Sequence, residues 1–156
     1  MSIKLRVRGF EVVNEGMREH EGEVQLPVRA DVRSAGYDFF SPIDLILLPA
    51  QKTILMSDVK AYMLKDEVLE LYPRSSMGIK KGLMLSNTVG IIDSSYYENE
   101  SNDGNIGLPL LNTSGVAIEI KKGERIAQGI FKKYLVADDD AVLHAVRTGG
   151  MGSSGK

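Results

Sequence analysis

Apolar residues fall in short, mostly alternating runs, and this pattern constrains the fold more than any other feature of the chain. Such runs include IKLRVRGF (3–10), KTILM (52–56) and GVAIEI (115–120), and turn-forming Gly, Pro, Asn, Asp and Ser separate them at short intervals. A period of two is typical of half-buried strands, and its repetition between turns is typical of a β sandwich or barrel. We therefore predict an all-β fold.

One stretch is ambiguous, because DVKAYMLKDEVLELYP (58–73) fits either strands or one short helix. Nothing repeats at a fixed period and no linker divides the chain. A chain of 156 residues is long enough for one domain that buries roughly two thirds of its unfolded surface. We predict a β-barrel domain over 1–146, with at most a short helix, and a mobile Gly/Ser-rich C-terminal arm over 147–156.

Composition argues against several classes of protein. The chain has no cysteine, which excludes disulfides and thiolate metal sites, and His20 and His144 are too isolated to predict a zinc site. The net charge of −2 argues against a general nucleic-acid binder, which needs a basic surface. No run of 18 apolar residues and no signal-peptide core is visible, so we expect a cytoplasmic protein without membrane contact. An anionic ligand would need a local cationic cluster.

The C-terminal residues GGMGSSGK (149–156) contain most of the P-loop signature, G-x-x-x-x-G-K-[ST]. A P-loop needs a strand before it and a helix after it, because the helix N-terminus supplies amides to the phosphates. The sequence ends at Lys156, so we expect no P-loop. Terminal Gly and Ser are commonly a disordered tail, and the tail alone does not favour a phosphate grip.

Two segments carry side chains suited to phosphate or to acid–base chemistry. PRSSMGIKKGL (73–83) joins Arg74 to two serine hydroxyls, and arginine offers a fork of donors that matches phosphate oxygens. SNTVGIID (86–93) resembles a hairpin that presents backbone groups, and Asp93 at its end could deprotonate a water. A solvated turn and a capping carboxylate are the simpler alternatives, and these segments alone do not exclude them.

Two further segments are weaker signals. GERIAQGIF (123–131) is a predicted strand in which Arg125 and Gln128 interrupt the apolar pattern, and both fit outward-facing strand positions. RSAGYDFFSP (33–42) places Asp38 near a strand start, where a buried structural carboxylate is the simpler interpretation.

The order of the segments is more specific than any one of them. SAGYD, PRSSMGIKKGL, NTVGIIDSSY, GERIAQ and GGMGSSG resemble the five ordered motifs of the trimeric dUTPase family, from about residue 24 to the last residue. The resemblance implies a jelly-roll-like β fold and hydrolysis of dUTP to dUMP and pyrophosphate, which limits uracil in DNA and supplies dUMP for thymidylate synthesis. It also implies a homotrimer with shared active sites, and Mg²⁺ carried by the triphosphate and waters without a direct protein ligand.

The resemblance also implies residue roles. Asp93 would activate the water that attacks the α-phosphorus, and Tyr96 would pack on the deoxyribose and exclude a 2′-hydroxyl. The other residues expected at the uracil and sugar are Asn87, Ile91, Ile92, Gly107 and, from the arm, Met151. The residues expected at the phosphates are Arg74, Ser75, Ser76, Gln128, Arg147, Ser153 and Ser154, with Asp38 in support.

The chain departs from the family pattern in four places. Met151 stands where the family usually has Phe, and the tail is one residue shorter between Arg147 and the double Gly. Ser95 replaces a common Asp. The acidic segment YENESND (97–103) contains about six extra residues, which we interpret as a longer solvent-exposed loop or, alternatively, a docking surface for a protein partner.

Two other functions are considered on the same fold. A dCTP deaminase would need a glutamate base where this chain has Pro109, which cannot transfer a proton. A non-catalytic nucleotide-sensing regulator would not need both Asp93 and Tyr96, and the chain retains both.

Overall fold

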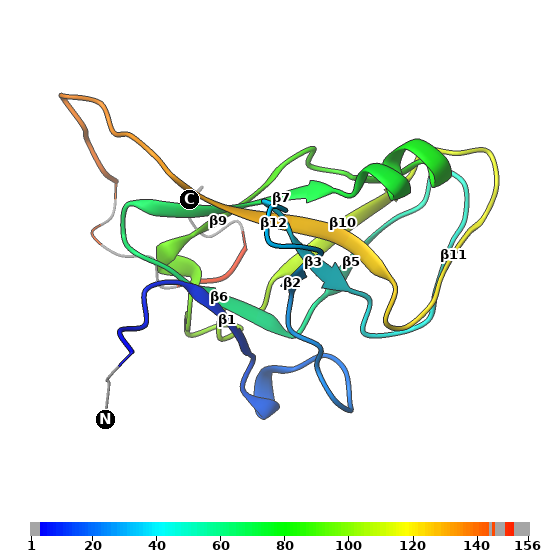
Figure 1. The fold of residues 1–156 in the computed structure, drawn as a ribbon, viewed down its shortest axis with the longest axis horizontal. Coiled ribbons are helices and arrows are strands. Elements are labelled where there is room, and N and C mark those ends of the chain that lie inside the picture. Colours follow the sequence, from blue (N-terminus) through cyan, green and yellow to red (C-terminus); the bar gives the residue numbers. More distant parts are fainter. Residues whose placement is uncertain (1–3, 144, 146–148, 152–156) are drawn as a thin grey trace.

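The computed structural model describes residues 4–143, 145 and 149–151, and strands dominate this part of the chain (Figure 1). The strands are β1 (Gly9–Val12), β2 (Val28–Arg29), β3 (Tyr37–Phe40), β4 (Leu45–Leu47), β5 (Lys52–Met56), β6 (Val59–Tyr62), β7 (Glu67–Pro73), β8 (Leu83–Leu85), β9 (Gly90–Asp93), β10 (Gly107–Asn112), β11 (Ile118–Ile120) and β12 (Arg125–Lys133). The helical segments are η1 (Glu15–Met17), η2 (Ser76–Lys81) and η3 (Ser94–Tyr96). The all-β prediction is confirmed.

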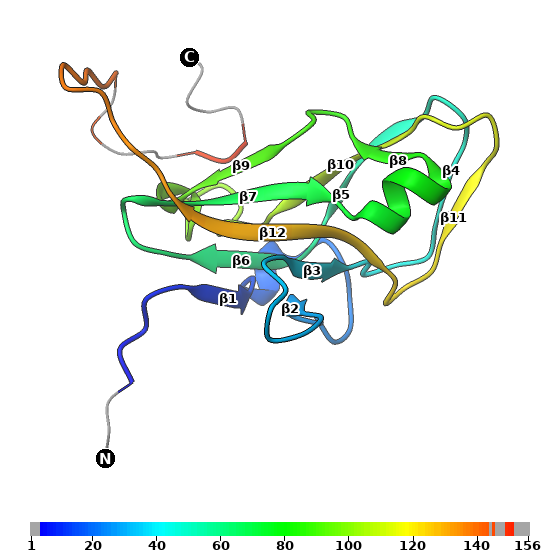
Figure 2. The same ribbon diagram turned by 45° about the horizontal axis from the view of Figure 1, so that its top comes forward.

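The strands pair antiparallel in two main sheets. One has the order β2-β3-β12-β7-β9 and the other the order β5-β10-β8, while β1 pairs with β6 and β11 with β4 (Figures 1 and 2). The core takes apolar side chains from both sheets, among them Phe39, Leu69 and Leu71 from the first and Leu108 and Leu110 from the second. Each is at most 1% exposed, and a fully buried side chain of this size contributes about 1.5–3 kcal/mol.

The ambiguous stretch 58–73 forms β6 and β7 rather than a helix. The short helical segment is instead η2, which follows Pro73 and ends at Gly82. Gly82 adopts a φ of 71° and donates its backbone N–H to the carbonyl of Gly78. A left-handed residue that returns its N–H to the last turn is the common way to end a helix, and glycine adopts it without steric cost.

The prediction of a hairpin over 86–93 is wrong. β8 pairs with β10 in the three-stranded sheet, whereas β9 pairs with β7 in the five-stranded sheet. Residues 86–89 therefore carry the chain from one sheet to the other. The apolar faces of β8 and β9 are both buried in the core between the sheets, and this burial decides their partners.

The segment 97–103 is a loop, as predicted, but it is exposed only in part, with Glu98, Glu100 and Ser101 at the surface. Asn99 and Asp103 are 7% and 6% exposed, and Asp103 pairs with Lys60, which is itself 3% exposed. The ion pair between Asp103 and the buried Lys60 holds this part of the segment against the body of the domain. Among the residues that the structure describes, no helical segment has the length and apolar character of a membrane span.

Candidate active site

A cavity of about 410 Å³ opens between β9 and β10, and we call it the β9–β10 cavity. It brings together all seven residues that the sequence predicts for water activation and for uracil and deoxyribose binding. Its lining residues are Leu71, Asn87, Gly90, Ile91, Ile92, Asp93, Tyr96, Gly107, Pro109 and Met151.

Two glycines keep this cavity open. A Cβ atom on Gly90 would lie 2.9 Å from the Cβ of Leu71, so only glycine lets β9 approach β7 here. A Cβ atom on Gly107 would lie 2.9 Å from Cγ2 of Ile54 and 3.2 Å from Cε of Met151. Contacts this short force a neighbour to move, and a side chain at position 107 would take space from a ligand.

Asp93 is the last residue of β9 and immediately precedes η3. Its side chain makes no capping hydrogen bond to η3, so the structure does not support the alternative of a helix-capping carboxylate. Among the described residues that line the cavity, Asp93 alone carries a carboxylate. Pro109 lines the same cavity.

Tyr96 is 3% exposed and is held by its hydroxyl. The hydroxyl donates to the backbone carbonyl of Asn105 at 2.7 Å and accepts from Nδ2 of Asn102 at 2.8 Å. Both the donor and an acceptor site of the phenol are therefore used, which restricts rotation of the ring where it borders the cavity.

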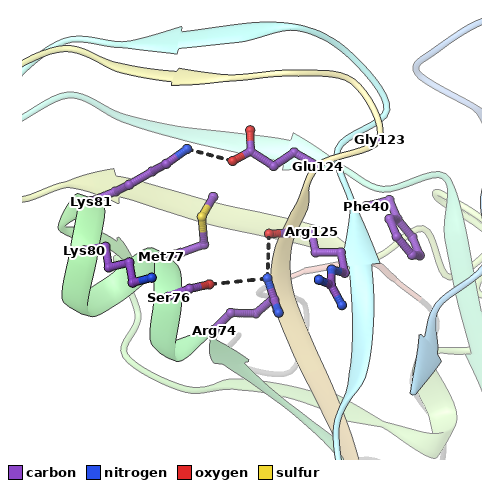
Figure 3. A pocket seen from close by; sticks show the side chains of 9 residues that line it. All are labelled: Phe40, Arg74, Ser76, Met77, Lys80, Lys81, Gly123, Glu124 and Arg125. Carbon is purple, nitrogen blue, oxygen red and sulfur yellow. Dashed lines mark hydrogen bonds and ion pairs between the residues drawn. The ribbon is translucent and has the colours of Figure 1, made fainter. Parts of the chain in front are cut away.

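A second cavity, of about 420 Å³, lies between η2 and the start of β12, and we call it the cationic cavity (Figure 3). Its lining residues are Phe40, Arg74, Ser76, Met77, Lys80, Lys81, Gly123, Glu124 and Arg125. Four of these residues are basic and one is acidic, and Glu124 is paired with Lys81 at 2.7 Å. The hydrogen bond from Lys81 lowers the pKa of Glu124 although its burial opposes this shift. The remaining positive charge suits a polyanion.

Asp38 organises the arginines of this cavity. Its Oδ1 pairs with Nε of Arg74 at 3.0 Å and its Oδ2 with a terminal nitrogen of Arg125 at 3.3 Å. The other side of the Arg74 guanidinium donates to Oγ of Ser76 and to the carbonyl of Arg125, each at 3.4 Å (Figure 3). Arg74 is thus oriented before any ligand arrives, and a fixed guanidinium loses less entropy on binding an anion.

Arg125 is the residue that sequence reasoning missed. The pattern of β12 assigned it to an outward-facing position, and its side chain is indeed 46% exposed. Only the register of β12 with β3, which pairs Arg125 with Phe40 and Gln128 with Asp38, places it beside the Asp38 carboxylate. Its position in the GERIAQ motif, three residues before Gln128, was the one available signal.

The other predicted phosphate residues do not line the cationic cavity or lie outside the described residues. Gln128 donates to the carbonyl of Pro73 at 3.3 Å and is packed so tightly against Gly36 that a Cβ there would lie 2.2 Å from its Oε1. Ser75 immediately precedes η2 and is exposed, and neither residue lines the cationic cavity. The other predicted phosphate residues, Arg147, Ser153 and Ser154, lie outside the described residues.

Asp93 of the β9–β10 cavity and Arg74 of the cationic cavity are far apart on one chain. Asp93 pairs with Val68 near the start of β7, whereas Arg74 follows Pro73 at its end. Five residue steps separate Val68 from Pro73, which corresponds to about 17 Å along the strand. Figures 1 and 2 show η2 and residues 149–151 apart along the long axis of the molecule.

Comparison with known proteins decides the family. A family model described as dUTPase matches residues 22–155 of the chain. The chain belongs to the dUTPase family. The deoxyuridine 5'-triphosphate nucleotidohydrolase of Lactococcus lactis is 40% identical to it over 97% of this chain and 99% of the relative, and that of Mus musculus is 34% identical over 83% and 78%.

Solved structures agree with this assignment. The crystal structure of the dUTPase from Streptococcus mutans superposes with a TM-score of 0.75 and 37% identity, over 83% of this chain and 98% of that one. The fold is therefore the jelly-roll-like β fold of dUTPases, as predicted.

Proposed function

We propose that this dUTPase hydrolyses dUTP to dUMP and pyrophosphate, with Asp93 as the base that activates the attacking water. The water oxygen bonds to the α-phosphorus, the bond from that phosphorus to the bridging oxygen of pyrophosphate breaks, and the water proton passes to the Asp93 carboxylate. Family membership supports the reaction. The observation that carries the residue assignment is that Asp93, Tyr96 and Gly107 border one cavity of about 410 Å³.

Shape and backbone groups select the nucleoside. Asn87 and the backbone of Ile91 and Ile92 line the β9–β10 cavity, where they face the uracil edge and reject a 4-amino group. Buried polar groups left unpaired by the wrong base discriminate strongly. The ring of Tyr96, held through its hydroxyl, packs on the deoxyribose and leaves no space for a 2′-hydroxyl.

The phosphates bind in the cationic cavity. Arg74 and Ser76 bind phosphate oxygens there, Arg125 adds a second guanidinium, and Asp38 positions both arginines. Ser75 and Gln128 contribute from beside the cavity. Mg²⁺ fits this site on the triphosphate and its waters, because both oxygens of Asp38 already hold arginines. The ion then offsets negative charge on the phosphates.

The active site is shared between copies of the chain in a homotrimer. Asp93 and Arg74 of one chain lie about 17 Å apart by strand spacing, too far for both to act on one α-phosphorus. A second copy that brings its cationic cavity to the β9–β10 cavity completes the site.

Complementation tests this sharing. Asp93→Asn and Arg74→Ala chains, each impaired alone, should gain activity beyond either single variant when mixed and reassembled. Random pairing in a closed ring completes about a quarter of the sites. No recovery from a mixed oligomer verified by mass spectrometry would mean that each chain holds a complete site.

The arm closes the site. Met151 already lines the β9–β10 cavity, with its Cε near Gly107. We assign residues 147–156 to an arm distinct from the domain 1–146, in which Arg147, Ser153 and Ser154 hold the distal phosphates. A closed arm excludes water and fixes the phosphates for in-line attack.

The experiment that tests the function is pyrophosphate release with Mg²⁺ from dUTP, dCTP, dTTP and UTP in parallel. Release from dUTP alone supports the reaction and the account of base and sugar selection. Ammonia from dCTP would make the chain a deaminase, and dUTP binding without turnover would make it a nucleotide sensor. The absence of cysteine fits a cytoplasmic enzyme that limits uracil in DNA.

A further inference from the structure

The segment 97–105 is built around the side chain of Asn99. Its Nδ2 donates to the carbonyl of Tyr96 at 2.8 Å and to Oδ1 of Asn102 at 2.7 Å, and its Oδ1 accepts from the hydroxyl of Ser101 at 2.8 Å. Asn99 is 7% exposed. The segment therefore has one defined shape, which a merely tolerated insertion would not need.

The segment 97–105 is also bound to the body of the domain through Lys60 and Asp58. Lys60 donates to Asp103 at 2.9 Å and to Glu98 at 3.2 Å. Asn105 and Asp58 exchange two hydrogen bonds, each at 2.9 Å, and both residues are at most 1% exposed. Burial alone would lower the pKa of Lys60, but the hydrogen bonds that Lys60 donates to Asp103 and Glu98 outweigh this effect and raise the pKa. These contacts attach the segment to β6 and to the residue just before it.

The opposite side of the segment meets two parts of the proposed active site. Asn102 donates from Nδ2 to the hydroxyl of Tyr96 at 2.8 Å. On the arm, a Cβ atom on Gly150 would lie 2.7 Å from Oγ of Ser101 and 3.4 Å from Nδ2 of Asn102. The arm thus rests on the segment at Gly150, one residue before Met151 enters the β9–β10 cavity.

We propose that Asn102 is a positioning residue that couples sugar selection to closure of the arm. It orients the Tyr96 ring through the phenol oxygen, and with Ser101 it forms the seat on which Gly150 rests. The seat accepts only glycine, because the hydroxyl of Ser101 is held by Asn99 and cannot turn away without losing that bond. The inference rests on the proposed function, since it concerns the sugar and arm of the same site.

The first experiment measures kcat/KM for dUTP and UTP in Asn102→Ala, Tyr96→Phe and the double variant. Asn102→Ala should lower the ratio of kcat/KM for dUTP to kcat/KM for UTP about three- to tenfold. This is the effect expected from the free energy of one lost hydrogen bond. If Asn102 acts through the phenol, the double variant should be no less selective than Tyr96→Phe alone. Glu100→Ala, at an exposed position of the same segment, is the matched control and should keep the wild-type preference.

An unchanged preference in Asn102→Ala, or full additivity in the double variant, would overturn the link to Tyr96. If Asn102→Ala does not fold by circular dichroism, Asn102→Asp takes its place. That variant keeps the acceptor oxygen toward Asn99 and removes the donor toward Tyr96. Wild-type chain that fails to release pyrophosphate from dUTP would instead reject the proposed function, so the two failures are distinguishable.

The second experiment tests the seat. Gly150→Ala should raise KM for dUTP about tenfold, as expected for a misfit of one methyl group. Ser101→Ala in the same chain removes the clashing oxygen and should restore most of the loss. A Gly150→Ala chain with wild-type KM, or one that Ser101→Ala does not rescue, would show that the arm does not rest on this segment.

Discussion

The cationic cavity and the β9–β10 cavity are built on opposite principles. The first gathers charged side chains that hold one another, with Asp38 fixing Arg74 and Arg125 in place. The β9–β10 cavity is lined mainly by apolar residues. Two of its positions, Gly90 and Gly107, are glycines that bring no side chain to it. A polyanion needs preorganised charge, whereas a base and a sugar need shape and correctly placed backbone groups.

The distance between Asp93 and Arg74 on one chain decides how the two cavities can be tested. In the proposed site, Asp93 lies opposite Val68 near the start of β7, whereas Arg74 follows Pro73 at the end of the same strand. The two residues can therefore be tested separately, and Asp93→Asn and Arg74→Ala should each affect one cavity and leave the geometry of the other intact.

The largest effect should come from the single carboxylate of the β9–β10 cavity. Asp93→Asn should lower kcat about 10²–10⁴-fold, the usual contribution of general-base catalysis, while KM for dUTP changes little. Steady-state pyrophosphate release measures both parameters. A fall of less than about tenfold would remove Asp93 from the role of base.

Removal of the arm should come next. A chain truncated after Arg147 should lose about 10²-fold in turnover, because poorly fixed phosphates lose the geometry of in-line attack. Its sedimentation behaviour and thermal unfolding should match those of the full chain. Unfolding of the truncated chain would mean that the arm is structural and that the closure account is wrong.

Arg74→Ala should reduce kcat/KM about ten- to hundredfold, since hydrogen bonds to charged groups are worth about 1.5–3 kcal/mol. Lys80→Ala is the matched comparison in the same cavity, and its effect should be about threefold, because Lys80 is exposed and loses more side-chain entropy on binding. Equal losses in the two variants would mean that the cavity acts by net charge and not by the orientation that Asp38 imposes.

The smallest effect should come from a pair outside both cavities. Hydrogen bonds from Arg8 hold the pKa of Glu67 below its ordinary value of 4.5, although burial opposes the shift. Such a carboxylate stabilises the fold above pH 4.5, and the stability is lost as pH falls through the lowered pKa.

Glu67→Gln should therefore lower Tm at neutral pH and flatten its decline below pH 4.5, with dUTP turnover unchanged at 25 °C. Thermal unfolding from pH 3 to 7 measures this. A parallel pH dependence in both chains would assign the acid sensitivity to other carboxylates.

The sequence by itself determined the all-β class and the family, because alternation is a local pattern and the order of the five motifs is read directly along the chain. Arg74 and Ser76 are separated by one residue, so their meeting is decided by a single helical turn. Seven of the ten residues that line the β9–β10 cavity were also named from the sequence, through the family resemblance rather than through physics alone.

Only the tertiary structure decided the contacts between distant strands. It assigned β8 and β9 to different sheets, brought Arg125 to Asp38, and brought Asp103 of the acidic segment 97–103 to Lys60. Alternation along a strand tells which side chains face the core, but not which strand lies beside it. The strand pairings depend on the packing of the whole domain. They decide which charged side chains lie beside each other, such as Arg125 and Asp38.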